Sequence, residues 1–327
     1  MSIISVKDLY KEFHVPVRKK GFLGSLRSLF SRQSLTRVAI NHVSFDVHEG
    51  ELLGYIGPNG AGKSTTVKLL SGILLPTSGE VKILGKTPWV NRVETARQIG
   101  VVFGQRTQLW WDLPVIESFD LLRDIYRVSD QNYKKILDTL TSTLELSKIL
   151  NVPVRQLSLG QRMRCDLAAS LLHSPKILFL DEPTIGLDAV SKLAVRDFIK
   201  HLNKEHKVTV LLTTHDMDDI ESLCKRVLIL NEGQIFLDGP LSTLRKKMLP
   251  ERHLIVDMDK EIEGIEIEGA EVFKREGHRL YIRFNPDVIS TPKLISEITG
   301  KHAIHDLYVE NPPIEEIIAK FYRDANL

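Results

Sequence analysis

An eight-residue loop constrains the folding of this chain more than any other feature. Residues 57–64 read Gly-Pro-Asn-Gly-Ala-Gly-Lys-Ser and fit the spacing G-x-x-x-x-G-K-S. Glycines let the backbone turn its N–H groups toward phosphates, Lys63 supplies positive charge, and the Ser64 hydroxyl can hold Mg²⁺. The apolar run 52–56 predicts a buried strand before this phosphate loop, and residues 65–70 predict a helix after it. A nucleotide site is therefore expected, with contacts from Gly57, Pro58, Asn59, Gly60, Ala61, Gly62, Lys63, Ser64 and Thr65.

Composition narrows the class of protein. The 327 residues allow one large α/β domain and a smaller one, and 43% of them are hydrophobic. A net charge of +2 gives no global argument for nucleic-acid binding. The chain has only Cys165 and Cys224, so a disulfide framework or a cysteine metal site is not expected. The expected compartment is a reducing cytosol. We see neither a signal peptide nor an apolar run of about eighteen residues, so a membrane role would need a separate membrane-embedded partner.

Apolar runs alternate with helical stretches to about residue 240, which predicts an α/β domain with a largely parallel sheet. The buried-type runs 177–180 and 208–212 end in Asp181-Glu182 and Thr213-Thr214-His215. Because ligands bind beyond the carboxyl ends of such strands, these polar residues should converge on the phosphate loop. A helical subdomain is expected at about 106–172, with helices at 114–128, 132–146 and 159–173, and a hairpin is expected at 227–237.

The pattern changes after about residue 245. Strand-like runs at 254–258, 271–273, 280–284 and 304–309 alternate with helix-like runs at 291–299 and 314–322. We therefore expect a nucleotide-binding domain over residues 1–245 and a small α+β domain over 246–327.

Two adjacent carboxylates after a short apolar run suit metal-assisted hydrolysis of a phosphoanhydride. Asp181 would orient Mg²⁺ through water, and Glu182 would polarise the attacking water. Two exposed acids at a strand end are the simpler interpretation of the pair alone, but the phosphate loop upstream favours the catalytic one.

The segment Leu157-Ser158-Leu159-Gly160-Gln161 predicts the start of a helix. Ser158 followed three residues later by Gln161 is a capping box. The same helix N-terminus, with a hydroxyl and a glycine, could hold a γ-phosphate through its N–H groups and dipole. The two interpretations are compatible.

Four motifs occur in the order and spacing of the ATP-binding cassette (ABC) ATPases: the phosphate loop, residues 157–161, residues 177–182 and His215. Residues 3–245 resemble this family. The resemblance implies a P-loop NTPase fold with a helical subdomain that binds ATP and Mg²⁺. It also implies that Gln105 senses Mg²⁺ and couples to the permease, that Asp188 crosses the dimer interface, and that His215 contacts the γ-phosphate. Phe13 resembles the aromatic that stacks on adenine, with Tyr10 as its competitor and a core role open for either.

In that family two cassettes pair head to tail, so that Ser158, Gly160 and Gln161 of one close on the ATP held by the other. The resemblance therefore implies a second cassette, identical or paralogous. This chain departs from the pattern at Leu159, where glycine is commonest, and at Gly104, which adds a residue before Gln105.

Adjacent tryptophans follow Gln105, within Gln108-Leu109-Trp110-Trp111-Asp112-Leu113. In the family this segment lines the groove that receives a permease helix, so Trp110 and Trp111 are candidate anchors for a separate transmembrane permease. The alternative is that both are buried between subdomains.

Residues 18–37, within an insertion at about 15–37, carry six basic residues and no acidic one. Their apolar residues recur at helical spacing, which predicts a basic amphipathic helix at an anionic membrane surface or against the permease. The alternative is a hairpin extension whose apolar stripe packs on its own sheet. The apolar residues are Phe22, Leu23, Leu26, Leu29 and Phe30.

Four segments are most similar to bacterial multidrug or viologen-type export cassettes: this insertion, the run 57–66, Thr77-Ser78-Gly79-Glu80 and the tail at 311–316. The resemblance implies an ATPase at the cytoplasmic face of the membrane that exports drugs or other small amphiphilic compounds, with a regulatory or dimerising C-terminal domain. An importer cassette and a soluble cassette acting on ribosomes or DNA are the alternatives. No nucleic-acid partner is expected.

Overall fold

The computed structural model describes residues 2–16, 34–104, 106–243, 251–260 and 267–311. The chain divides into two compact units, Met1–Gly239 and Pro240–Leu327. The sequence-based boundary, between residues 245 and 246, fell slightly later.

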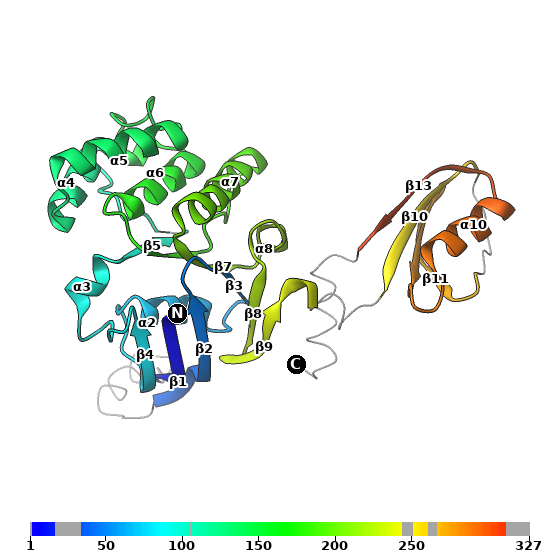
Figure 1. Cartoon of the computed structure of the whole chain (residues 1–327), viewed down its shortest axis with the longest axis horizontal. Coiled ribbons are helices and arrows are strands. Elements are labelled where there is room, and N and C mark those ends of the chain that lie inside the picture. Colours follow the sequence, from blue (N-terminus) through cyan, green and yellow to red (C-terminus); the bar gives the residue numbers. More distant parts are fainter. Residues whose placement is uncertain (1, 17–33, 105, 244–250, 261–266, 312–327) are drawn as a thin grey trace, which may run out of the picture. The chain divides into compact units, whose positions relative to one another are not determined.

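A six-stranded sheet, counted over the described residues, forms the centre of the first unit, in the order β5-β6-β7-β3-β8-β9 (Figure 1). The neighbours from β5 to β8 pair in parallel. Every residue of β3, β6 and β7 is buried, because helices cover both faces of such a sheet. The strands are β3 Leu52–Ile56, β5 Ile99–Phe103, β6 Ile177–Asp181, β7 Thr209–Thr214, β8 Arg226–Asn231 and β9 Gln234–Pro240.

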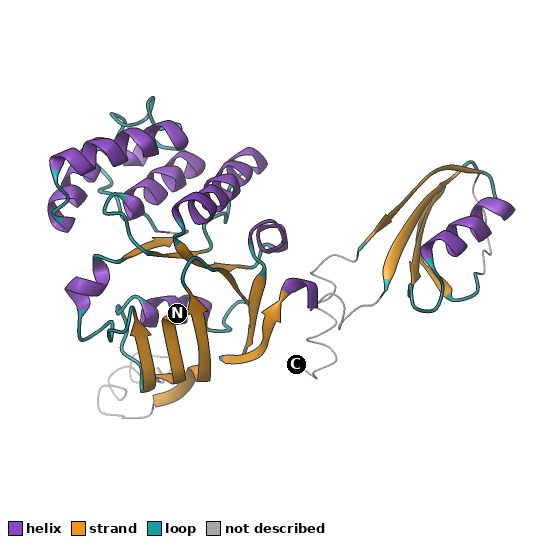
Figure 2. Ribbon diagram, in the orientation of Figure 1, coloured by secondary structure: helices purple, strands orange, loops and turns teal. Residues whose placement is uncertain are grey.

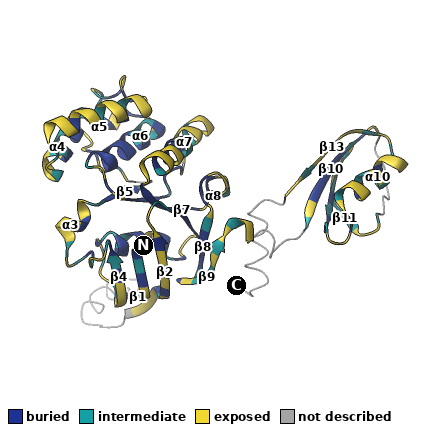
Figure 3. Cartoon of the chain, viewed as in Figure 1, coloured by how far each residue is buried: buried dark blue, intermediate teal, exposed yellow. Residues whose placement is uncertain are grey.

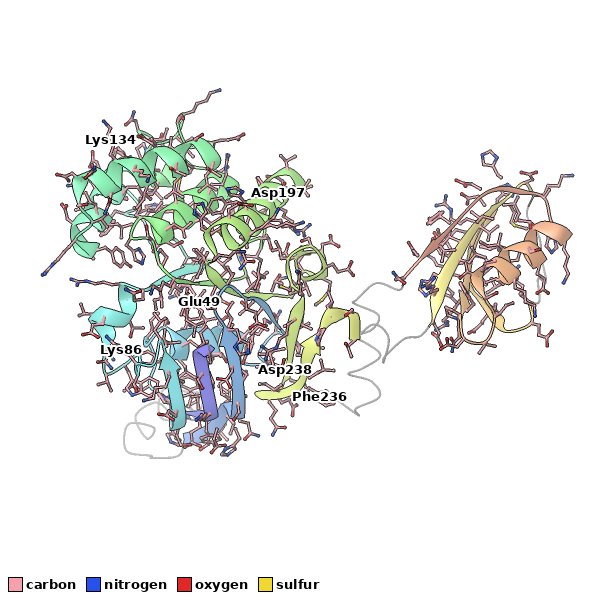
Figure 4. All side chains as sticks on the ribbon, in the orientation of Figure 1. Glu49, Lys86, Lys134, Asp197, Phe236 and Asp238 are labelled. Carbon is pink, nitrogen blue, oxygen red and sulfur yellow. The ribbon has the colours of Figure 1, made fainter. Side chains whose placement is uncertain are left out.

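Strands β8 and β9 are neighbours in the sheet and confirm the hairpin expected at 227–237. Across it, Asp238 accepts two hydrogen bonds of 2.6 Å from the Arg226 guanidinium (Figure 4 labels Asp238). A bidentate pair of this kind fixes the register of an edge strand.

The described residues of this unit also form a three-stranded antiparallel sheet, in the order β2-β1-β4. Its strands are β1 Ser2–Pro16, β2 Ser34–His48 and β4 Ser78–Ile83. Residues 34–37, the end of the basic segment, belong to β2 and pair with β1, whereas residues 18–33, which include the run 22–30 whose spacing predicts the amphipathic helix, lie outside the described residues.

Helices cover the sheets and supply most of the chain between β5 and β6. Figure 2 shows α4, α5 and α6 grouped as the helical subdomain that the sequence predicted. α2 contacts β2 and β4 on one side and β6 on the other, so it joins the two sheets. Of the helices in the described residues, none is long and apolar enough to cross a membrane. The helices are α2 Lys63–Leu70, α3 Arg92–Ala96, α4 Val115–Tyr126, α5 Asp130–Thr143, α6 Leu159–Leu171, α7 Ala189–His206 and α8 Met217–Leu223, with a 3-10 turn, η1, at Val154–Gln156.

Over its described residues, the second unit forms a four-stranded antiparallel sheet, in the order β11-β12-β10-β13, with one helix packed on it. Its own core joins Leu254 and Val256 of β10 to Leu294 and Ile298 of the helix, whose outer face is exposed (Figure 3). The expected helix at 314–322 lies outside the described residues. The elements are β10 Arg252–Met258, β11 Ala270–Glu276, β12 Arg279–Phe284, α10 Thr291–Lys301 and β13 Ile304–Glu310.

Candidate functional site

The phosphate loop leads from the end of β3 at Ile56 into α2, which begins at Lys63. The predicted strand, loop and helix are confirmed. Gly62 has φ 106°, and a Cβ there would lie 2.4 Å from the carbonyl oxygen of Ala39. Only glycine fits a backbone that is both left-handed and this close to β2. The loop is therefore held against the antiparallel sheet.

Lys63 turns its amino group back into this loop. The Nζ atom donates to the carbonyl oxygens of Gly57, at 2.7 Å, and Pro58, at 3.2 Å. Only 6% of the side chain is exposed, and this burial lowers the pKa of Lys63, while the carboxylates of Glu182 and Asp181 oppose the shift. The loop thus concentrates positive charge beside its backbone N–H groups.

Asp181 and Glu182 reach the same place because β6 runs parallel to β7 in register. Asp181 pairs with Thr213, whose hydroxyl donates to Asp181 Oδ1 at 2.5 Å. The Glu182 N–H donates to the Thr213 carbonyl at 2.9 Å. Glu182 itself adopts φ 55°, a left-handed conformation that costs a non-glycine residue roughly 1 kcal/mol or more. The strand end therefore buries Asp181 and turns the next carboxylate into the site.

Glu182 lies between the loop lysine and the histidine that follows β7. Its Oε1 is 3.9 Å from Lys63 Nζ, and its Oε2 is 3.0 Å from His215 Nδ1. The Glu182 side chain is 19% exposed and the His215 side chain 53% exposed. A carboxylate held by an imidazole and reached by solvent has the geometry of a general base for water.

A buried network fixes the loop that carries His215. Asp219, which is fully buried, accepts hydrogen bonds from Thr184 and Thr214 and pairs with Arg196 of α7. Asp216 pairs with Lys192 and Arg196, and although burial opposes it, these cations lower the pKa of the Asp216 carboxyl. α7 thus holds the segments after β6 and after β7 in fixed relation. The sequence analysis missed these residues, because nothing local in the pattern marks them.

A cavity of ≈ 580 Å³ opens beside the phosphate loop. Phe13 lines it and Tyr10 is not among its lining residues; Tyr10 instead stacks on His42, with ring centroids 5.1 Å apart, and donates to Glu12. The sequence analysis missed His14, Val15 and Arg37 here, because only the pairing of β1 with β2 brings them to the loop. The lining residues are Phe13, His14, Val15, Arg37, Ala39, Asn59, Gly60, Gly62, Lys63, Ser64, Thr65 and Glu182.

The segment Leu157-Ser158-Leu159-Gly160-Gln161, at the start of α6, is not among the residues that line this cavity. The capping box is confirmed: Ser158 Oγ accepts from the Gln161 N–H at 3.2 Å, and Gln161 Oε1 accepts from the Ser158 N–H at 2.9 Å. A Cβ on Gly160 would lie 2.4 Å from Ser191 Oγ and 4.0 Å from Asp188 Oδ2. The N-termini of α6 and α7 therefore meet at Gly160, and together they form the signature cluster of Ser158, Gly160, Gln161 and Asp188.

Leu159 departs from the expected glycine without entering this cluster. Its Cδ2 atom would lie 3.0 Å from a Cβ placed on Gly186, which has φ 71°. Asp188 caps α7 by accepting from the Ser191 N–H at 2.9 Å, and this bond lowers the pKa of the Asp188 carboxyl. Leu159 thus packs on the glycine that precedes the cap.

Gln105 lies outside the described residues, but the tryptophan loop that follows it, residues 106–112, is described. Trp110 is 39% exposed and Trp111 50% exposed, so the alternative of tryptophans buried between subdomains was wrong. The Arg162 guanidinium lies 5.5 Å from the Trp111 ring.

Asp166 of α6 accepts from Thr107 Oγ1 at 2.8 Å and from the Gln108 N–H at 3.0 Å. Burial of Asp166 raises the pKa of this carboxyl to about 6.

The donors near the loop suit Mg²⁺ chemically. Mg²⁺ takes oxygen ligands and is usually bound by one or two carboxylates together with substrate phosphates. Ser64 offers an exposed hydroxyl at the cavity, and Asp181 offers a carboxylate of which one oxygen is occupied by Thr213. The described residues contain no cluster of three or more His, Cys, Asp or Glu side chains that could hold a metal by themselves. This arrangement fits an ion that binds with a nucleotide.

Comparison with known proteins identifies the family. The family model described as "ABC transporter" matches residues 40–185. The ABC transporter ATP-binding protein NatA of Bacillus subtilis is 30% identical over 227 residues, which cover 69% of this chain and 92% of NatA. The chain belongs to the ABC transporter family. It is an ATP-hydrolysing cassette of that family, with the P-loop NTPase fold.

Two further relatives of this ABC cassette are much longer than the matched region. The probable multidrug ABC transporter ATP-binding protein YbhF of Escherichia coli is 35% identical over 209 residues, 63% of this chain and 35% of YbhF. The cholesterol transporter ABCA5 of Rattus norvegicus is 33% identical over 265 residues, 81% of this chain but only 16% of ABCA5. Their full activities therefore say nothing direct about this cassette.

A solved ABC cassette shares the fold. The dimeric, post-hydrolysis structure of the cassette MJ0796 bound to ADP and Pi aligns with a TM-score of 0.61 at 28% identity. It covers 73% of this chain and 98% of MJ0796.

The buried Asp166 predicts a pH dependence of stability. Its pKa is about 6 in the folded cassette and near 3.8 when unfolded, so folding favours the protonated carboxyl. The stabilisation is fully present below pH ~4 and is lost as the pH rises to ~6, a total of about 3 kcal/mol. Chemical denaturation at several pH values should show the difference in unfolding free energy between the parent and Asp166→Asn falling by that amount. Asp197→Asn, on the exposed side of α7, is the control variant, and a difference independent of pH would contradict the prediction.

Proposed function

We propose that this cassette is the ATP-binding and ATP-hydrolysing subunit of a transporter whose transmembrane permease is a separate chain. The observation that supports it most is the meeting of Lys63, Glu182 and His215 beside one cavity at the carboxyl ends of β3, β6 and β7. The cassette would work at the cytoplasmic face of the membrane.

In this proposal the nucleotide fills the cavity, with adenine against Phe13 and the phosphates on the loop N–H groups and Lys63. Lys11 lies over the Phe13 ring, with its Nζ atom 5.0 Å from the ring centroid. Water attacks the γ-phosphorus, the bond to the β–γ bridging oxygen breaks, and Glu182 takes the proton of the water. His215 holds Glu182 in place through the 3.0 Å contact and faces the γ-phosphate.

Mg²⁺ would be held by Ser64, Asp181 and Gln105 and would neutralise charge on the phosphates. Asp181 is already oriented for that task by the Thr213 hydroxyl.

The signature cluster supports a head-to-tail dimer. Ser158, Gly160, Gln161 and Asp188 are not among the residues that line this chain's own nucleotide cavity. A capped helix N-terminus that presents N–H groups binds anions, so a second cassette could use the cluster to close on a γ-phosphate. The solved relative MJ0796 is itself a dimer.

We further propose export of drugs or other small amphiphilic compounds. The relative YbhF is named a probable multidrug transporter ATP-binding protein, and ABCA5 a cholesterol transporter. The second unit has its own hydrophobic core and would serve regulation or dimerisation.

Replacing Glu182 by glutamine should arrest the cycle after ATP binding. The amide keeps the shape but cannot take a proton, so ATP turnover should fall by roughly 100-fold or more. Size-exclusion chromatography with ATP should show a dimer that persists, while Glu94→Gln, an exposed glutamate paired with Lys86, should behave like the parent. Turnover at the parental rate in Glu182→Gln would overturn the assignment of the base.

Mixing two inactive variants tests whether each site is shared between chains. Lys63→Ala disables the phosphate loop and Ser158→Ala disables the signature, so either homodimer should be inactive. In a head-to-tail mixed dimer both defects fall in one site and the other site is intact. Equal mixing should therefore restore about a quarter of parental ATPase activity, because about half of the dimers are mixed. Activity that stays at the level of the single variants would contradict the shared site.

The exposed tryptophans should anchor the permease. The double variant Trp110→Ala, Trp111→Ala should weaken association with membrane subunits by roughly 30-fold or more, since buried aromatic anchors dominate interfaces. Co-purification from solubilised membranes measures this, and ATP affinity should be unchanged. Phe236→Ala, an exposed aromatic on β9 (Figure 4), is the control. Undiminished co-purification of the permease with the double variant would remove the tryptophans from the proposal.

A further inference from the structure

The tryptophan loop is hydrogen-bonded to α6 at one buried residue, Asp166. Asp166 Oδ1 accepts from both the Thr107 hydroxyl and the Gln108 N–H, and the Asp166 carbonyl oxygen accepts from Gln108 Nε2 at 2.9 Å. Thr107 Oγ1 in turn accepts from the Leu109 N–H at 3.1 Å. Three consecutive residues of the loop are therefore arranged around one side chain of the helix.

The loop also makes polar contacts with other parts of the first unit. The Trp110 N–H donates to Ser118 Oγ of α4 at 3.2 Å, and the Trp111 carbonyl accepts from the Arg155 N–H of η1 at 3.0 Å. On α6, the Arg162 guanidinium also contacts the Trp111 ring. Asp166 attaches the loop to α6 by hydrogen bonds.

Core packing alone does not explain a carboxylate at this position. Asp166 is 4% exposed, and burial of a carboxylate is costly unless donors compensate. Its flanking residues on the helix, Cys165 and Leu167, are fully buried, and Arg162 is the nearby cation. An apolar side chain would fill the space without that cost. What Asp166 adds is the loop attachment.

The same helix begins at the signature cluster. Ser158 caps α6 two helical turns before Asp166, and Gly160 contacts the start of α7. A helix transmits a displacement along its axis as a rigid element, whereas a loop does not. The two ends of one rigid helix segment therefore hold the proposed permease contact and the proposed γ-phosphate contact.

We propose that Asp166 is a positioning residue that clamps the tryptophan loop onto the signature helix, so that a permease segment pressing on Trp110 and Trp111 moves Ser158 and Gly160 with it. The movement of Ser158 and Gly160 rests on the permease partner that the proposed function assigns. The clamp itself can be tested on the cassette alone.

The first measurement is acrylamide quenching of tryptophan fluorescence in the full chain, with Trp89→Phe so that only Trp110 and Trp111 report. Asp166→Ala should raise the quenching constant about twofold, because losing a charged acceptor shifts a local docking equilibrium by about tenfold or more. Asp166→Asn keeps an acceptor oxygen and should restore most of the protection. Ser170→Ala, which removes a buried hydroxyl bonded only within α6, is the matched control.

The second measurement is the ratio of permease-stimulated to basal ATPase activity in reconstituted membranes. The ratio should fall toward one in Asp166→Ala and recover in Asp166→Asn. If Asp166→Ala does not fold, Thr107→Val removes the same hydrogen bond from the loop side. Quenching that is unchanged in both Asp166→Ala and Thr107→Val overturns the clamp. If quenching changes but the ratio of permease-stimulated to basal ATPase activity does not, the clamp does not transmit movement from the tryptophan loop to Ser158 and Gly160. Absence of stimulation in the parent counts against the proposed function and leaves the quenching result to decide the clamp.

Discussion

The parallel register of β3, β6 and β7 is the constraint on which the site depends. Leu53 pairs with Leu211 and Asp181 pairs with Thr213, so the three strands end at one edge of the sheet. A shift of one residue would turn Asp181 to the other face and move Glu182 away from Lys63. The hydrophobic effect sets this register, because every side chain of the three strands is buried. Packing of the apolar strands therefore sets the positions of Asp181 and Glu182.

The sequence predicted the parts of the site that depend on local spacing. The phosphate loop and the capping box are recognisable within eight residues, and the approach of Glu182 to His215 follows from a general rule about parallel strands. It did not predict Arg37 at the cavity or the Asp166 clamp. Arg37 arrives through antiparallel pairing with Phe13, and Asp166 meets Thr107 across 59 residues of chain. Neither contact has a periodic or local signal.

α6 combines three requirements that are usually met by separate elements. Its first turn is capped by side chains, its second residue must be glycine to approach α7, and its middle carries a buried acid. Each requirement limits what the others can tolerate, since removing the cap frays the end that Gly160 positions. Helix propensity alone would therefore be a poor guide to substitutions in this segment.

The left-handed backbone of Glu182 sets activity against stability at one residue. Glycine adopts a φ of 55° without strain, whereas a residue with a side chain is strained there. The proposed chemistry nevertheless requires a carboxylate at this position. Selection for stability alone would favour glycine at this position, which would remove the proposed base. The proposed base thus lies on a strained backbone, and screens that reward thermal stability alone would enrich variants that have lost it.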